Sequence, residues 1–399
     1  MRYLYCDLET YSTKPINCGP HAYAEEAEIL LFPYAVGEDA LPNVWDVAND
    51  MLYVGKDWGN PQPLGGAWPA DLYRNFFDTE VMTVWHNGGN FDRVILHHVF
   101  GVDLEQDLPV ERMHDTMVQA LTHGLPGGLD MLGEIYKLDG DTAKLKTGRQ
   151  LINLFCKPRP KNQKIRRATK ETHPKEWLEF VGYSYRDITS MRVLRKKIPM
   201  WNYTGKEREL WNLDQRINNR GFYVDLNLAE SALEAVDREQ KRLAKATEKA
   251  TNGEVKRATQ RDALLKHLLT EHGVALPDLT GATIERRLND PGLPEGVKEL
   301  LRLRQQASTT STSKYKALVK AASSDSRLRG TLQFCGASRT GRWAGRTFQP
   351  QNLPRPSLEQ DEITQAIKDL KNGVIDFTFD DVMTATSSSV RGCICAPRS

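Results

Sequence analysis

Short runs with a period of two characterise the first part of the chain. Residues 2–10 alternate tyrosines and an aspartate with Leu4, Cys6 and Leu8, which predicts a β-strand. Further strands are expected at 29–36, 44–47 and 81–86, and helical spacing follows at 92–99, 115–123 and 129–138. Strands followed by alternating strands and helices predict a mixed α/β sheet.

A different pattern begins after the basic segment near residue 160. Pro174 at a first helical position predicts a helix that runs to about Lys197. Long charged helices are then expected at 227–250, 259–272 and 297–322. The last segment is richer in Gly, Pro, Arg and Ser and does not look self-contained. We therefore expect three parts, at 1–200, 201–328 and 329–399.

The composition of the 399 residues is that of an ordinary globular protein, with 40% hydrophobic and 27% charged residues. It excludes collagen-like, coiled-coil and wholly disordered chains. The net charge is only +2, so a nucleic-acid site must be a local basic patch. Six scattered cysteines suggest neither a zinc site nor a disulfide framework, and no long apolar run is present. We expect a soluble cytoplasmic protein.

The strongest local charge lies in residues 157–170, KPRPKNQKIRRATK, which we name the basic loop. It holds seven basic residues, two prolines and no acid. This composition predicts an exposed loop. It is either a solvated connector or a contact to a phosphate backbone.

Two carboxylates on the first strand are candidates for metal binding. Asp7 and Glu9 are two residues apart, so their side chains leave the same face of a strand and can share a cation. Surface strands also carry such pairs without a metal. The apolar neighbours predict a largely buried strand, where two carboxylates are costly without a cation, and oxygen ligands suit hard divalent metals.

Two later acids complete the set. Asp92 follows the strand at 81–86 at a strand-to-helix corner, where it either faces the carboxyl edge of the sheet or only caps the helix. Asp187 lies four residues after Tyr183, so both side chains share one helix face. That spacing is also common in ordinary helix packing.

The order of these motifs resembles the DEDDy class of 3′–5′ exonucleases, the proofreading domain of family A DNA polymerases. The motifs are D-x-E, an Asn upstream of an Asp, and Y-x-x-x-D. Asn87 precedes Asp92 by five residues, whereas the family usually places it four before. The resemblance implies a ribonuclease H-like domain in which Asp7, Glu9, Asp92 and Asp187 hold two Mg²⁺ or Mn²⁺ ions. It also implies that Tyr183 positions the attacking water and that Asn87 contacts DNA.

Residues 336–356 form a second candidate site, which we name the arginine arm. Arginine side chains bind phosphates in a bidentate manner, and side-chain amides contact sugars or base edges, so this segment is a candidate nucleic-acid contact. The alternative is a generic basic loop with no specific ligand. The candidate DNA-binding residues of the arm are Arg339, Arg342, Arg346, Gln351 and Asn352. The segments T-G-R and Q-N-L-P resemble the motif that precedes the catalytic palm acids in family A polymerases, which implies contact with primer-template duplex.

The resemblance extends to GLPGGLDMLGEIYKL, KTGRQLINLFCKP and LDQRINNRGFYVD. The chain thus resembles the exonuclease domain, thumb-like helices and first palm segment of a phage-type family A polymerase, with host cytoplasm as its location. The palm acids of the family do not follow, so we expect no primer extension by this chain alone. The chain is expected to be either a piece of a longer polymerase or one half of a split polymerase, in which case a separate palm and fingers chain is its partner. Alternatives are an autonomous DEDDy nuclease acting on RNA and a non-catalytic DNA-binding subunit of a split polymerase.

Overall fold

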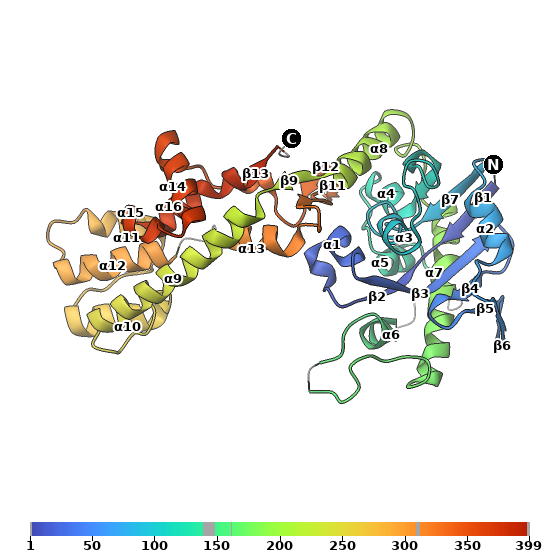
Figure 1. Cartoon of the computed structure of the whole chain (residues 1–399), viewed down its shortest axis with the longest axis horizontal. Coiled ribbons are helices and arrows are strands. Elements are labelled where there is room, and N and C mark those ends of the chain that lie inside the picture. Colours follow the sequence, from blue (N-terminus) through green and yellow to red (C-terminus); the bar gives the residue numbers. More distant parts are fainter. Residues whose placement is uncertain (1, 139–147, 161, 309–311, 397–399) are drawn as a thin grey trace. The chain divides into compact units, whose positions relative to one another are not determined.

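The computed structural model describes residues 2–138, 148–160, 162–308 and 312–396 (Figure 1). The chain divides into two compact units. Unit 1 comprises Met1–Gly221 and Ser323–Thr347, and unit 2 comprises Phe222–Ala322 and Phe348–Ser399. The segment 329–399, which carries no separate core in its sequence, is therefore shared between them. Within the described ranges, every helix is too short or too polar to cross a membrane.

Unit 1 is built on a mixed sheet, which confirms the α/β prediction. The order is β6-β5-β4-β3-β1-β7-β8, and β2 pairs with β3. β1, β7 and β8 are parallel, whereas the strands from β1 through β3 to β6 are antiparallel. The strands are β1 (Arg2–Cys6), β2 (Glu9–Ser12), β3 (Ala27–Val36), β4 (Asn43–Asp46), β5 (Met51–Val54), β6 (Asp57–Pro63), β7 (Val81–Trp85) and β8 (Met113–Asp115).

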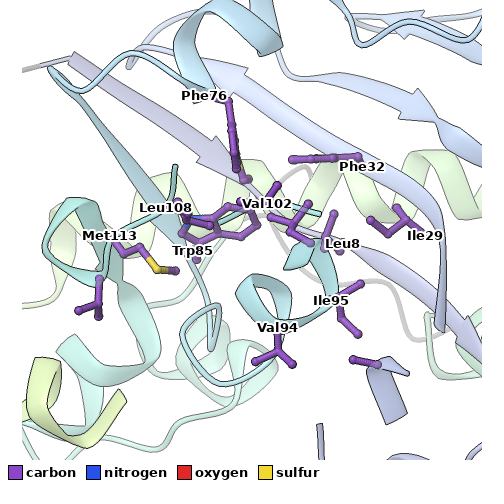
Figure 2. Close-up of a cluster of buried hydrophobic side chains, with 14 of the residues drawn as sticks. Leu8, Ile29, Phe32, Phe76, Trp85, Val94, Ile95, Val102, Leu108 and Met113 are labelled. Carbon is purple, nitrogen blue, oxygen red and sulfur yellow. The ribbon is translucent and has the colours of Figure 1, made fainter. Parts of the chain in front are cut away.

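Helices pack on both faces of this sheet because successive strand residues point to opposite sides. Leu4 and its neighbours on one face join a core with the helices α2 (Ala70–Phe76) and α3 (Asp92–Phe100). Figure 2 shows this cluster, which includes Phe32 and Trp85. On the other face Tyr5 packs with residues of α7 (Pro174–Lys197). The sheet thus lies between two helical layers.

The first strand is shorter than predicted. β1 ends at Cys6 and β2 begins at Glu9, so Asp7 and Leu8 lie between two strands rather than within one. Extending the register of β1 with β3 places Asp7 opposite Pro33, and the Asp7 N–H donates to the Pro33 carbonyl at 3.2 Å. Proline has no N–H to return, which explains the break in the ladder. The interruption places Asp7 at the end of a strand.

The remaining elements of unit 1 cover the predicted helices at 115–123 and 129–138, with shorter bounds. α4, α5 and α6 contact α7. After unit 2 the chain re-enters unit 1 at Ser323 and forms the hairpin of β11 and β12. These elements are α1 (Pro20–Ala24), α4 (Thr116–Leu121), α5 (Leu129–Ile135), α6 (Gly148–Phe155), α8 (Gly205–Arg220), β10 (Arg327–Leu328), β11 (Leu332–Ala337) and β12 (Arg342–Gly345), with 3₁₀ turns at Ile16–Cys18, Val47–Asn49 and Val110–Arg112.

Unit 2 is mostly helical and is organised around α9 (Leu226–Ala250). Its buried residues recur at helical spacing, from Leu228 through Ala232 and Val236 to Leu243, and the helix contacts α12, α14 and α16. β9 (Phe222–Val224) pairs with β13 (Ile394–Cys395). The other elements are α10 (Arg261–His272), α11 (Gly281–Leu288), α12 (Glu295–Ala307), α13 (Thr312–Ala321), α14 (Gln360–Asn372), α15 (Ile375–Thr378) and α16 (Val382–Ser389), with 3₁₀ turns at Pro350–Asn352 and Val390–Cys393.

The single helix expected at 297–322 is wrong. α12 ends at Ala307, Ser308 is its C-cap, and α13 begins at Thr312. The Ser308 hydroxyl donates to the Arg304 carbonyl at 2.6 Å. Ser side chains compete with the helical backbone bonds, which accounts for the end of α12 at Ser308.

Candidate active site

Three of the predicted acids meet at the broken end of the first strand. Asp7, Glu9 and Asp187 each offer a carboxylate oxygen, and these oxygens all lie within 4.8 Å of one another. Asp7 follows β1, Glu9 opens β2 and Asp187 comes from α7. Glu9 and Asp187 are buried, whereas Asp7 is half-buried. Oxygen ligands converging in this way fit a hard divalent cation.

Asp92 lies outside that group of three but is electrostatically linked to it. It is the first residue of α3 and its side chain is buried. Burial, followed by the nearby Asp7 carboxylate, raises the pKa of Asp92 well above its usual range. Among the described residues, none hydrogen-bonds the Asp92 Oδ1 atom. A buried carboxylate oxygen with no donor is costly, and an approaching cation would relieve that cost.

The turn before Asp92 is held by a residue that the sequence pattern did not single out. Asp115 is fully buried, and its carboxylate accepts the backbone N–H groups of Asn87 at 3.0 Å and Gly89 at 3.3 Å. The same carboxylate caps α4. Asn87 has a φ of 67°, and a Cβ at Gly88 would approach Trp85 Cβ at 2.3 Å. The sequence placed Asp115 at the start of a predicted helix, but it did not show that its carboxylate binds backbone groups more than twenty residues upstream.

Tyr183 lies beside the three acids on α7, one turn before Asp187. Its ring is buried, and burial raises the pKa of the phenol, with Asp187 as the next cause and then Glu9 and Asp7. Gly148 at the start of α6 packs against this ring, because a Cβ there would lie 2.3 Å from the Tyr183 Cε2 atom. The sequence pattern did not reveal this dependence on Gly148, since the two residues belong to different helices.

Two cavities border the carboxylates. The larger, of about 700 Å³, is lined by Glu9 and by mostly apolar neighbours including Phe91 and Ile152, with Lys14 and Lys157 also in its wall. The buried Cys156 thiol lines it as well and donates to Glu9 Oε2 at 3.7 Å. The smaller, of about 290 Å³, is lined by Asp7, Asp187 and Asn87 among others. Asn87 thus shares a cavity with two of the acids.

The arginine arm is divided between the two units. Arg339 and Arg342 lie on the exposed turn and strand of the β11–β12 hairpin, and Arg346 follows it and hydrogen-bonds Gln333. The hairpin is fixed to α8, where the Asn218 side chain donates to the Leu332 carbonyl and accepts its N–H, each at 3.0 Å. Gln351 and Asn352 are exposed in the 3₁₀ turn of unit 2.

Comparison with known proteins shows a similarity to a phage protein. No protein-family model matches the chain. It is 34% identical over 400 residues to a "DNA polymerase" of Bacillus phage SP02, an alignment that covers 98% of this chain and 57% of that protein. The chain therefore spans little more than half the length of that relative. The POL domain of Pol1 from M. smegmatis, solved with DNA primer-template and dNTP, has a TM-score of 0.47 at 13% identity over 89% of this chain and 53% of that one.

Proposed function

We propose that residues 1–200, which lie within unit 1, form a metal-dependent 3′–5′ exonuclease that acts on DNA and that the chain is part of a family A DNA polymerase. The observation that supports this most is the convergence of Asp7, Glu9 and Asp187 within 4.8 Å. The relative from a Bacillus phage supports the polymerase assignment. In this proposal residues 1–200 form a ribonuclease H-like domain, 201–328 a thumb-like domain and 329–399 the start of a palm.

The residues present fit a pair of divalent ions. Asp7, Glu9 and Asp187 provide neighbouring oxygens. The buried Oδ1 atom of Asp92, which accepts no hydrogen bond from the described residues, provides another. Two bound Mg²⁺ or Mn²⁺ ions would supply Lewis acidity to the attacking and leaving oxygens of a phosphodiester. The four carboxylates would hold the metal ions, because carboxylate oxygens are ligands that hard divalent cations prefer.

Tyr183 has a limited role in this mechanism. Because burial and three neighbouring acids raise the pKa of its phenol, the hydroxyl keeps its proton at neutral pH. A protonated phenol can donate to or orient a water molecule, but it cannot serve as a general base. We therefore assign Tyr183 to the positioning of the attacking water. Gly148 leaves space for the ring in that position.

The large cavity beside Glu9 would receive the terminal nucleotide. Its apolar wall, with Phe91 and Ile152, suits a base or sugar, and Lys14 and Lys157 suit a phosphate. The exposed Arg339, Arg342 and Arg346, together with Gln351 and Asn352, would contact duplex DNA. In a phage-infected cell the enzyme would act in the host cytoplasm.

One experiment tests the proposal. The purified chain is mixed with single-stranded DNA or RNA labelled at the 5′ end, with Mg²⁺ or with a chelator. We expect a ladder of products shortened stepwise from the 3′ end of DNA, and only with Mg²⁺. Preferential degradation of RNA would favour the autonomous ribonuclease, and binding without degradation would favour a non-catalytic subunit; either result would contradict the proposal.

A further inference from the structure

The basic loop is strongly positive, and apart from Lys157 the proposed mechanism does not use its cations. It connects α6 to α7 and extends away from the sheet of unit 1 (Figure 1). The Arg159 N–H donates to the Arg166 carbonyl at 3.2 Å, and the Gln163 N–H donates to the Pro160 carbonyl at 2.9 Å. These bonds join its two arms and form a turn near its tip. The loop therefore has a defined shape within its described residues.

The base of the loop is fixed to unit 1 by two of its own cations. Arg167 forms a bidentate pair with Glu28, at 2.9 and 2.6 Å, and its guanidinium lies 4.2 Å from the centre of the Tyr11 ring. Lys170 lies 3.9 Å from an oxygen of the buried Asp46. Ala168 between them is buried. These cations stabilise the loop, so their charges are already compensated.

The remaining described cations are available to a ligand. Lys157 donates to the neutral Asn153 side chain at 2.7 Å. Within the described ranges, Lys157, Arg159, Lys164 and Arg166 form no ion pair with an acid, in contrast to Arg167 and Lys170. Lys164 and Arg166 are exposed and Arg159 is half-buried. Positive side chains held together without acids attract a polyanion.

The loop begins in the wall of the larger cavity, since Lys157 and the adjacent Pro158 line it together with Glu9. A single DNA strand with its 3′ end in that cavity would pass the basic loop where it leaves the cavity. We propose that Lys157, Arg159, Lys164 and Arg166 contact successive phosphates of the single DNA strand whose 3′ end occupies the cavity. The inference rests on the proposed exonuclease function and adds the path of its substrate. Because the contacts are to phosphates, they are independent of base sequence.

The test measures binding rather than hydrolysis. Fluorescence anisotropy measures the affinity of the full chain for a short and a long fluorescent oligothymidylate. The measurements are made over a series of NaCl concentrations, with a chelator present to prevent hydrolysis. The variant combines Arg159→Gln, Lys164→Gln and Arg166→Gln and leaves the cavity residue Lys157 unchanged. A matched control neutralises the exposed Lys56, Arg74 and Lys197 with Gln. A charge-retaining variant carries Arg159→Lys and Arg166→Lys.

For the long oligonucleotide we expect the loop variant to bind about tenfold more weakly. Its salt dependence should also flatten, by about 0.7 in log–log slope for each phosphate that the variant no longer neutralises. The short oligonucleotide, the control and the charge-retaining variant should change little. An unchanged affinity and slope, or an equal change in the control, would overturn the inference. Weaker binding by the loop variant, with no hydrolysis by the wild type, would instead contradict the exonuclease assignment and leave the loop contact standing.

Discussion

The acidic site and the arginine arm differ in how the chain holds their charges. The acids are buried or half-buried, come from separate elements and lie close enough for Asp7 to raise the pKa of Asp92. The arginines are exposed, and the arm is shared between two units. A site for chemistry needs charges in fixed positions, whereas a surface for a polyanion needs only their sign. We therefore expect substitutions in the acidic site to have large effects and those in the arm to have small ones.

The largest effect is expected from replacing Asp7 and Glu9 together with Ala. Loss of metal ligands should lower the rate of DNA hydrolysis by roughly a thousandfold or more while the fold is retained. A control that replaces the exposed Asp57 and Glu80 with Ala should keep the wild-type rate. Both rates are measured in Mg²⁺ on 5′-labelled single-stranded DNA. Full activity in the double variant would remove the acids from the mechanism.

Tyr183→Phe should have the next largest effect. It removes only the hydroxyl, so the rate should fall roughly ten- to a hundredfold while metal affinity is kept, because the phenol orients water and is not a ligand. Calorimetric titration with Mn²⁺ beside the rate assay separates the two quantities. A parallel collapse of metal affinity would show that Tyr183 acts as a ligand or supports the fold.

Asp92→Asn should stabilise the metal-free protein. The folded-state pKa of Asp92 is raised by burial and by Asp7, so above the unfolded value of about 3.9 the folded state binds more protons and stability falls as pH rises. At neutral pH the variant should gain about 1 to 3 kcal/mol in free energy of unfolding. The gain should vanish below the unfolded-state pKa of about 3.9, where the carboxyl is protonated in both states. Urea denaturation with a chelator measures it, and a loss of stability at neutral pH would contradict this account.

Gly148→Ala should reduce the rate of hydrolysis about tenfold by displacing the Tyr183 ring, because small misplacements of a positioning group are costly. Gly281→Ala is the matched control, since Gly281 also opens a helix and a methyl group at its Cβ position would have nothing within 4 Å. In the background of Tyr183→Phe, a further loss from Gly148→Ala should be smaller. Equal losses in both backgrounds would show that Gly148 acts independently of the hydroxyl.

The smallest effect is expected from Arg339→Gln with Arg342→Gln. Duplex affinity should fall a few-fold, and its log–log salt slope should fall by about 0.9 for each phosphate that is no longer neutralised. Hydrolysis of single-stranded DNA should be unchanged, because the residues lie outside the acidic site. Anisotropy with a primer-template duplex provides the measurement. A large loss of hydrolysis would mean that the arm belongs to the catalytic site.

The sequence predicted those features whose cause is local. Asp7 and Glu9 share a short motif, and Tyr183 and Asp187 share one helix turn, so spacing alone grouped them. The helix at 174–197 followed from Pro174 at its start and the helix at 227–250 from its pattern of charged and apolar residues, and both are confirmed. The end of α12 at Ser308 was not predicted, because the helical pattern continues after the Ser/Thr run that Ser308 begins.

Features that depend on distant partners were not predictable. Pro33 interrupts the pairing of the first strand, but its position opposite Asp7 depends on the register of two strands. Asp115 holds the turn at Asn87 through backbone bonds across the sheet edge. Gly148 matters because of a ring on another helix. In each case the residue is ordinary in sequence and acquires its role through tertiary contact.

The most direct test of the central claim is anomalous diffraction from crystals of the chain soaked in Mn²⁺. We predict two peaks about 3.5 to 4 Å apart. They should lie within ligand distance of Asp7, Glu9, Asp92 and Asp187. Absence of manganese at these carboxylates, in protein that degrades DNA from the 3′ end with Mn²⁺, would contradict the claim that the buried acids form the catalytic metal site.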